Sequence, residues 1–444
     1  MFLTRSISIR LTSFTLLYMA QGVPIGLISI ALPAWLVAQG ADASDVATLA
    51  AITGLPWGFK LISGPFMDRF SFPAMGRRRP WVMGAQAGLT LAILSLATVG
   101  EPDAQLWTLI VFGTVINSFG AVQDVAVDGM AISALPEEER GRANAFMAFG
   151  QVAGFSLFGA LDGYLLAHFG LPVTALVSAV TVGGVFVFVT LVREQEGERL
   201  LPWTAGSATP GTHAVSASFT GIFRDLLLVL FLPMSLVLIG VEFLHRLAAG
   251  VAISIYPVIA VQDLGYTAEQ YSYWMGILSG FSAVLGLAFG PFIDRFGAPR
   301  LLMVGFILAI FVLLGFALAE PYWGHTNVVL TGVILHQITI QLIFIAVIAS
   351  FMSVCSPAIA ATQFAVYMSL ANLSRSIGAG LFAFIAADTT SVQAIYIMVG
   401  LHAAGALLLT RFSLSEHRRR LAAAPSQTFQ HAIRAERECQ LGEQ

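Results

Sequence analysis

Hydrophobic stretches recur along the whole sequence, and each is long enough to cross a lipid bilayer. The hydrocarbon core of a bilayer is about 30 Å thick, so one crossing helix needs roughly 20 apolar residues. Because hydrocarbon offers no hydrogen-bond partners, each crossing segment must satisfy its own backbone groups, which favours α-helices. The first stretch is also far longer than the roughly 7–15 residues of a signal-peptide core. We predict an all-α membrane protein with twelve transmembrane helices, over residues 11–37, 47–66, 80–99, 106–134, 143–167, 171–192, 226–260, 271–292, 299–319, 328–353, 360–386 and 392–411.

The composition excludes several classes of protein. Of the 444 residues, 57% are hydrophobic and 11% are charged, which is less than half the charged fraction of about 25% in soluble domains. The net charge is only −3, and no basic patch with interleaved aromatic residues points to nucleic acid. The two cysteines, Cys355 and Cys439, are too few for a disulfide framework or a metal cluster. We therefore expect no nucleic-acid partner, no metal and no cofactor.

The basic residues fall almost entirely on one side of the predicted membrane. Nineteen of the 22 lysines and arginines lie in the N-terminal segment, in or within two residues of the loops that follow even-numbered helices, or in or directly beside the C-terminal tail, and the loops on the other face contain none. Lysine and arginine accumulate in cytoplasmic loops, so both termini are predicted to be cytoplasmic. The three remaining cations, Lys60, Arg246 and Arg375, lie within predicted helices.

A seven-residue repeat indicates a division into two halves. Residues 64–70 read Gly-Pro-Phe-Met-Asp-Arg-Phe after the second helix, and residues 290–296 repeat six of the seven after the eighth. Parallel repeats of six helices place a substrate site at the middle of the membrane, between the halves. We predict two six-helix bundles over 1–192 and 223–411, a polar cytoplasmic linker over 193–222, and a solvated cytoplasmic tail over 412–444.

The repeated loop resembles the signature loop of the major facilitator superfamily. In its first copy, at residues 64–79, a glycine and an Asp-Arg pair are followed by a glycine and three arginines. A carboxylate beside a helix N-terminus meets the positive end of the helix dipole, and Ser356 and Pro357 suit the start of the eleventh helix. We expect Asp68 near that start and Asp294 near the start of the fifth helix. A merely solvated loop would explain the arginines but not the repeated glycine and aspartate. The predicted conformational latch comprises Asp68, Arg69, Arg77, Asp294 and Arg295.

Three further stretches narrow the resemblance. They read Gly-Val-Pro-Ile-Gly at 22–26, Gln-Asp-Val-Ala-Val-Asp at 123–128, and Ala-Thr-Gln-Phe-Ala at 361–365. With Phe59 and Lys60 before the signature loop, they look like the AmpG-type muropeptide permeases and the related acetyl-CoA transporters. The resemblance runs through most of the membrane region and implies a major facilitator fold in an inner membrane. These motifs leave the substrate open between a muropeptide, an acyl-CoA and a siderophore.

Ionisable residues inside the predicted helices are candidates for the functional site. A charge at bilayer depth costs at least about 2.5–3.5 kcal/mol, so each needs a partner, a water-filled cavity or a function. Lys60 and Asp128 lie at matched depth in the second and fourth helices, and we predict that they pair or share a hydrogen-bond network. Snorkelling of Lys60 to the interface is the alternative. Asp124 and Asn117 lie on the same face as Asp128, which predicts a polar stripe on the fourth helix.

The second half offers further candidates for proton or substrate binding. Glu242 and Arg246 have the i, i+4 spacing of an ion pair, with His245 beside them near the middle of the seventh helix. The pair could simply neutralise itself; alternatively, Glu242 and His245 take up protons while Arg246 binds a substrate anion. Arg375 in the eleventh helix matches an arginine of AmpG-like chains. His336 in the tenth helix is a further candidate, although a buried histidine bonded to a neighbour is common.

These features predict a proton-coupled symporter that is not an enzyme. It would act as a monomer and import an amphiphilic, anionic solute such as an anhydro-muropeptide, with protons and membrane lipids as its other partners. Acids and bases divided between the halves suit ion pairs that form in one access state and exchange for substrate or protons in the other. No nucleotide-binding loop of the Gly-x-x-x-x-Gly-Lys-Ser/Thr type occurs. The alternatives are an acyl-CoA or siderophore permease, a non-transporting assembly factor or receptor, and a membrane enzyme, for which no nucleophile and base arrangement is present.

Overall fold

The structure is a computed structural model that describes residues 2–3, 6–63, 66–67, 70, 72–76, 78–99, 106–135, 137–206, 219–356 and 360–423. Helices joined by turns and irregular segments make up this described part, with one isolated β-bridge between Phe2 and Arg193. Nine helical segments within it are long and apolar enough to cross a membrane, which confirms the predicted all-α membrane class. They are Ile7–Ala38, Arg79–Thr98, Leu106–Ala131, Phe146–Leu191, Pro233–Asp263, Ala298–Leu318, Thr326–Val354, Thr362–Asp388 and Ser391–Leu409.

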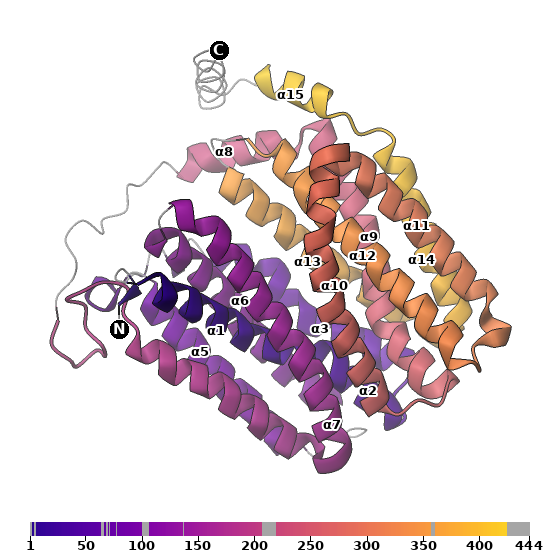
Figure 1. The fold of residues 1–444 in the computed structure, drawn as a ribbon, viewed down its shortest axis with the longest axis horizontal. Helices are drawn as coiled ribbons and strands as arrows, with labels where there is room; N and C mark the ends of the chain where they lie inside the picture. Colours follow the sequence, from indigo (N-terminus) through magenta and orange to yellow (C-terminus); the bar gives the residue numbers. More distant parts are fainter. Residues whose placement is uncertain are drawn as a thin grey trace. The chain divides into compact units, whose positions relative to one another are not determined.

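The helices follow one another along the chain, and the longest connection between described helices joins α7 to α8 (Figure 1). The first half contains α1 (Ile7–Gly26), which continues through a π-helical turn (Leu27–Ala31) into α2 (Leu32–Ala38), then α3 (Ala43–Phe59), α5 (Arg79–Ser95), α6 (Leu106–Ala134) and α7 (Glu137–Leu191). The second half contains α8 (Phe219–Leu230), α9 (Pro233–Val258), α10 (Ala268–Phe296), α11 (Ala298–Leu318), α12 (Thr326–Val354), α13 (Ala360–Ile385), α14 (Ser391–Leu409) and α15 (Leu414–Ala422).

The helix boundaries agree with most of the predicted spans. The long α7 covers the predicted spans 143–167 and 171–192, which are joined at Gly170, where φ is 74° and the path is not helical. The helix α10 covers the predicted span 271–292, whereas α3 covers residues 47–59 of the predicted span 47–66 and is followed by a 3-10 turn, Lys60–Ile62. The predicted start of the seventh span at residue 226 is wrong. The helix α8 ends at Leu230, and a separate helix, α9, begins at Pro233. Proline suits the first turn of a helix, where its missing N–H is not needed. The count of twelve spans stays a prediction.

The described chain forms two compact units that do not coincide with the two halves of the sequence. The first unit is Met1–Ala214 with Ala249–Val284 and Arg375–Ala394, and the second is Val215–Ala248 with Leu285–Ser374 and Ile395–Gln444. The helices α9, α10, α13 and α14 therefore each contribute residues to both units. The assignment of residues 1–192 and 223–411 to two bundles, with a linker over 193–222, stays a prediction.

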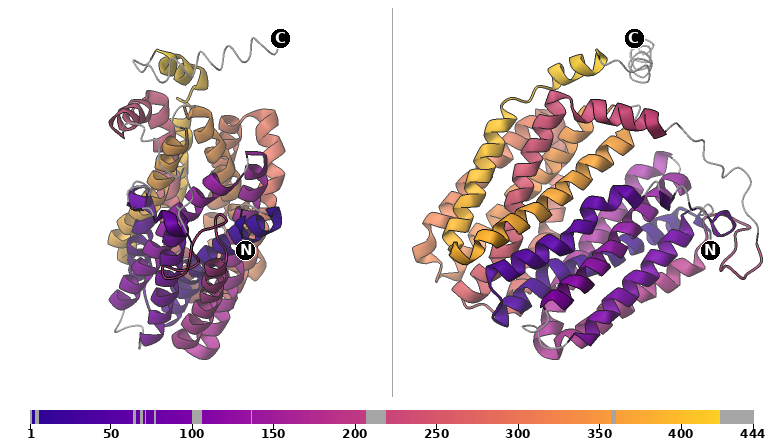
Figure 2. Two further views of the ribbon diagram at one scale, coloured as in Figure 1. Left: turned by 90° about the vertical axis from the view of Figure 1, so that its left-hand side faces the viewer. Right: turned by 180° about the vertical axis from the view of Figure 1, so that it is seen from behind.

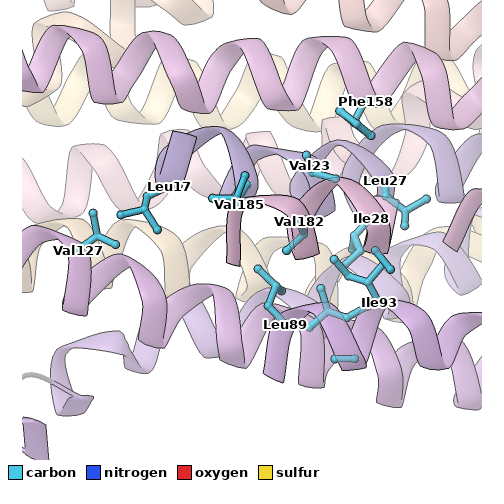
Figure 3. Packing of buried hydrophobic residues seen from close by; sticks show 14 of the residues in the cluster. Leu17, Val23, Leu27, Ile28, Leu89, Ile93, Val127, Phe158, Val182 and Val185 are labelled. Atoms are coloured by element: carbon cyan, nitrogen blue, oxygen red, sulfur yellow. The ribbon is translucent and has the colours of Figure 1, made fainter. Parts of the chain in front are cut away.

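The core of the first unit is built from aliphatic side chains of α1, α5, α6 and α7. Leu17, Leu89 and Val182 have no exposed surface, and Figure 3 shows the side chains of these helices gathered in one layer. Glycines bring α1 and α7 together: a Cβ added to Gly154 would lie 2.3 Å from Met19 O, and one added to Gly22 would lie 2.3 Å from Gln151 O. Small residues at such contacts let helices in a membrane approach and gain van der Waals contact.

At the end of the first unit that lacks basic residues, segments from both halves of the sequence meet. Gln262 Nε2 donates to Ala41 O over 2.9 Å. A Cβ on Gly163 of α7 would lie 2.2 Å from Ser272 Cβ of α10, and one on Gly54 of α3 would lie 2.3 Å from Ser376 Oγ of α13. Small residues therefore pack these helices tightly at this end.

In the second unit, α8 and α15 lie across the end of the helices, as Figures 1 and 2 both show. Leu421 of α15 packs with Leu226 and Val229 of α8, and His417 Nε2 lies 3.0 Å from Val354 O at the end of α12. His417 is 1% exposed. The predicted tail is therefore helical over Leu414–Ala422, and the apolar face of this short helix covers the bundle.

Candidate functional site

The predicted polar stripe on α6 is present in the first unit, and its residues contact neighbouring helices. Asn117, Asp124 and Asp128 lie on one helix face because they follow at spacings of seven and four. Trp57 Nε1 donates to Asn117 Oδ1 over 3.2 Å. The amide of Asn117 in turn donates to the carbonyl of Thr53 over 2.6 Å. Both partners are on α3, so Asn117 joins α6 to α3.

Asp124 lies at the centre of a polar network. Its Oδ2 accepts from Lys60 Nζ over 2.6 Å, and its Oδ1 accepts from Gln21 Nε2 over 3.0 Å. One turn further along α6, Asp128 accepts a hydrogen bond from the hydroxyl of Tyr18. Gln21 also accepts from the amide of Gln151 on α7. We call Tyr18, Gln21, Lys60, Asp124, Asp128 and Gln151 the α6 network.

The ion pair of Lys60 differs from the predicted one. Its partner is Asp124 rather than Asp128. Side chains on a helix point back toward the N-terminus, and the long lysine side chain reaches about one turn in that direction, whereas the short aspartate does not. The prediction compared only the depths of the two backbones. It therefore placed the amino group of Lys60 one turn too near the membrane surface. The contact of Lys60 Nζ with Asp124 favours pairing over snorkelling.

The network leaves one acid without a base of its own. The side chain of Asp124 is 7% exposed and that of Lys60 is 19% exposed, so this pair is shielded from solvent. Asp128 is half-buried and is bound by the neutral hydroxyl of Tyr18. Since a carboxylate at this depth is costly without a compensating charge, Asp128 is the member of the network best suited to take up a proton or a cationic group.

The expected i, i+4 pair is present in α9 of the second unit. Arg246 Nε lies 2.6 Å from Glu242 Oε1, and the guanidinium carbon lies 5.5 Å from the ring centroid of Phe344. Glu242 is 2% exposed. Its second carboxylate oxygen, Oε2, has no hydrogen-bond partner among the described residues. This oxygen is therefore available to a proton or to a donor group of a solute.

Three buried histidines lie beside this pair. The ring centroid of His402 lies 5.4 Å from that of His245 and 6.5 Å from that of His336. The three come from α14, α9 and α12, and all are at most 3% exposed. Within the described residues no group of His, Cys, Asp and Glu side chains could hold a metal ion. His245 and His336 are thus close neighbours of a third histidine that the sequence did not single out.

Arg375 belongs to the first unit and Arg246 to the second. Arg375 is half-buried on α13, and a Cβ added to Gly250 of α9 would lie 2.4 Å from its carbonyl oxygen. Its backbone is therefore at a close helix contact. A cavity shared by the two arginines stays a prediction.

The residues of the predicted latch are only partly within the described chain. Asp68, Arg69 and Arg77 lie outside the described residues. Asp294 falls in the last turns of α10, and the guanidinium of the exposed Arg295 lies 5.4 Å from the ring centroid of Phe296. The latch stays a prediction.

The last arginine of the signature loop has a structural position. Arg79 is 1% exposed, and its guanidinium donates to the carbonyls of Thr190 (2.5 Å), Val192 (2.6 Å), Leu200 (2.8 Å) and Arg199 (3.0 Å). Glu194 Oε1 accepts from the backbone N–H of Arg79 over 2.6 Å. A carboxylate satisfies free amides at a helix start and favours the positive end of the dipole. The start of α5 is thereby tied to the end of α7 and to the segment that follows it.

Sequence reasoning missed Tyr18, Gln21 and His402. Each is a polar residue within an apolar stretch, which was a readable signal, but none is charged at its ordinary pKa near pH 7. The sequence analysis gave most weight to charged side chains and therefore passed over these three. Gln151 was noted only within a family motif, and its hydrogen bond to Gln21 gives it a place in the α6 network.

Comparisons with known proteins agree with this architecture. The chain is 25% identical over 358 residues to the anhydromuropeptide permease of Escherichia coli (strain K12), covering 80% of this chain and 70% of that protein. It is also 25% identical over 373 residues to an uncharacterized protein of Haemophilus influenzae, covering 80% and 83%. A putative transporter, AmpG 4, of Rickettsia felis is 25% identical over 192 residues, covering 42% and 46%.

Solved structures with similar folds are transporters. A D-xylose-proton symporter has a TM-score of 0.70 at 15% identity, covering 92% of this chain and 98% of that one. The nucleoside transporter NupG has a TM-score of 0.66 at 14% identity, covering 91% and 98%. Likeness at these identities establishes the fold alone. The model of the Major Facilitator Superfamily matches residues 14–379 and 238–437, and the chain therefore belongs to this superfamily of multi-pass membrane transporters.

Proposed function

We propose that this transporter is a proton-coupled symporter that imports an amphiphilic, anionic solute of the anhydro-muropeptide class. It would act as a monomer in an inner membrane, with both termini in the cytoplasm, as the distribution of basic residues indicates. The observation that carries the proposal is the pairing of a buried acid with a base in each unit, Asp124 with Lys60 and Glu242 with Arg246, both at 2.6 Å. No catalytic activity is part of the proposal.

The Glu242–Arg246 pair gives a physical route to coupling. Glu242 Oε1 is bound to Arg246, while Oε2 has no hydrogen-bond partner in the described chain. A proton that binds Oε2 neutralises the carboxylate and weakens its hold on the guanidinium. Arg246 can then bind a carboxylate of the solute, because guanidinium and carboxylate form paired hydrogen bonds. Protonation and anion binding would thereby favour each other, which is the linkage that symport requires.

One comparison supports the substrate. The similarity to an anhydromuropeptide permease covers 80% of this chain, and a muropeptide, a sugar joined to a short peptide, is both amphiphilic and anionic. The amides of Gln21 and Gln151 in the α6 network are suited to the hydroxyl and amide groups of such a solute.

Uptake by the purified protein in sealed liposomes tests this function. A labelled anhydro-muropeptide, an acyl-CoA and a ferric siderophore are supplied in turn, with and without a pH gradient. We expect accumulation of the muropeptide that a protonophore abolishes. Accumulation that does not depend on the pH gradient would refute proton coupling. Uptake of the acyl-CoA or the siderophore instead of the muropeptide would refute the substrate class. No uptake of any solute would favour a non-transporting assembly factor.

Three variants sharpen the assay. Glu242→Gln should lose gradient-driven accumulation and keep exchange of solute across the membrane at equal pH, since the amide cannot exchange a proton. Asp124→Asn and Asp128→Asn test the α6 network in the same way. The matched control is Glu416→Gln, which removes an acid that pairs with Arg419 and Arg420 on α15. Full gradient-driven uptake by Glu242→Gln, Asp124→Asn and Asp128→Asn alike would show that none of these acids is the coupling site.

A further inference from the structure

In the second unit, His245, His402 and the carbonyl of Met398 form a chain of hydrogen bonds in which each donor and acceptor can be assigned. His402 Nδ1 lies 2.8 Å from the carbonyl oxygen of Met398, one turn earlier in α14. A carbonyl oxygen only accepts, so Nδ1 of His402 carries the hydrogen. In a neutral imidazole the other nitrogen, Nε2, must then be the acceptor. The backbone of α14 therefore fixes which nitrogen of His402 carries its hydrogen.

The position of the hydrogen on His402 determines the position of the hydrogen on the neighbouring ring, His245. His402 Nε2 lies 3.3 Å from His245 Nδ1. Because Nε2 of His402 is an acceptor, the hydrogen between them belongs to Nδ1 of His245. The second nitrogen of His245, Nε2, is then the one with a lone pair. The orientation is held by packing, since the ring of Phe306 on α11 lies 6.1 Å from that of His245 and 5.7 Å from that of His402.

Few other ionisable groups surround His245. From its own helix come Glu242 and Arg246, which are paired with each other. The helix α12 contributes His336, α14 contributes His402, and α11 contributes the uncharged Phe306. Glu242 and Arg246 neutralise one another, so His402 is the neighbour that can stabilise an added charge on His245 by a hydrogen bond.

We propose that His402 is a positioning residue that holds His245 with its hydrogen on Nδ1, so that Nε2 of His245 is a second proton acceptor beside the Glu242 carboxylate. The inference rests on the proposed proton coupling and adds this acceptor to it. When a proton binds Nε2, the imidazolium formed donates from Nδ1 to His402 Nε2, and a hydrogen bond from a charged donor is about twice as strong as a neutral one. Transfer of the Nδ1 proton to His402 would leave His245 neutral with its hydrogen on Nε2. Protons and charge balance in both steps.

The hydrogen assignment can be read without any transport assay. The probe is the full-length protein with ¹⁵N-labelled histidine in lipid bilayers, studied by solid-state nuclear magnetic resonance at a pH where the rings are neutral. The chain has eight histidines, and comparison with His245→Asn identifies the signal of His245. We expect a protonated Nδ1 and an unprotonated Nε2, the reverse of the form that free histidine favours. A protonated Nε2 on neutral His245 would overturn the proposal.

Two substitutions at His402 separate positioning from packing. In His402→Phe the ring is kept and the acceptor is lost, so His245 should revert to the form with hydrogen on Nε2. Gradient-driven uptake should then fall by about tenfold or more, with exchange at equal pH retained. In His402→Gln the amide oxygen can accept from His245 and the amide N–H can donate to Met398. The hydrogen on Nδ1 of His245 and gradient-driven uptake should therefore both largely return. Thermal unfolding of each variant verifies that it folds.

The outcomes distinguish this inference from the function on which it rests. If the wild-type protein transports without any proton dependence, the proposed function fails, and the nuclear magnetic resonance measurement alone decides the state of His245. If uptake is proton-driven and His402→Phe changes neither the state of His245 nor the pH profile of uptake, the positioning role of His402 is wrong and the function stands.

Discussion

Lys60 binds Asp124 at 2.6 Å, while Asp128, one turn away on the same face of α6, is bound by the hydroxyl of Tyr18. The two aspartates therefore have different hydrogen-bond partners, although they are only four residues apart. Removing one member of the Lys60–Asp124 pair leaves the other buried without compensation.

We expect Lys60→Met or Asp124→Leu alone to cost about 3–5 kcal/mol of stability, and the double variant to cost less than their sum. Thermal unfolding in detergent measures each. The comparison is Lys60→Met combined with Asp128→Leu, whose coupling should be weaker, because Asp128 is bound by Tyr18 and not by the lysine. Stronger coupling of Lys60 with Asp128 than with Asp124 would mean that the lysine pairs with the other aspartate.

The contact between α1 and α7 leaves no room for a methyl group at Gly154, where an added Cβ would lie 2.3 Å from Met19 O. Backbone atoms cannot move aside as a side chain can. Gly154→Ala should destabilise the protein by about 1–3 kcal/mol. Gly184→Ala on the same helix meets nothing within 4 Å and should leave the unfolding temperature nearly unchanged. Equal unfolding temperatures for the two variants would contradict the close approach of these helices.

The four carbonyls around Arg79 require the flat, branched guanidinium. Lysine keeps the charge but offers a single ammonium group, so Arg79→Lys should still lose most of these hydrogen bonds. We expect a clear fall in unfolding temperature and faster proteolysis between residues 193 and 206. Arg420→Lys is the control, because Arg420 is 51% exposed and pairs with Glu416 at the surface. A stable Arg79→Lys protein would mean that charge alone suffices.

The docking of α15 should depend on pH. Burial lowers the pKa of His417 from its ordinary value of 6.5, against the opposing effect of its contact with Val354 O. A group with a lowered pKa in the folded state stabilises that state above its unfolded pKa and loses this contribution as the pH falls. Hydrogen-exchange protection of Leu414–Ala422 should therefore be full at pH 8 and decline below about 6.5. His417→Gln, which stays neutral, should remove this decline; a decline that persists in the variant would have another cause.

The sequence predicted those features that are local or periodic. The helix spans, the repeated loop, the polar face of α6 and the Glu242–Arg246 pair all follow from spacing along one helix. Contacts between helices were harder, because helix rotation and side-chain direction decide them. The predicted partner of Lys60 was wrong for this reason. His402 was missed because its role depends on its contact with His245, which lies on another helix, α9. The docking of α15 was readable from Leu414, His417 and Leu421 at helical spacing.

Residues 193–206 have a consequence for fragment complementation. They hold Glu194 at the start of α5 and carbonyls that bind Arg79, and Arg199 N donates to Ala74 O over 2.7 Å. Although they follow the last predicted helix of the first half, they are packed as part of the first unit. Of two fragments produced separately, 1–206 and 207–444, the first would keep all these contacts. A division after residue 192 would strip α5 of its cap, and such a pair of fragments would fail for a reason unrelated to how the two halves recognise each other.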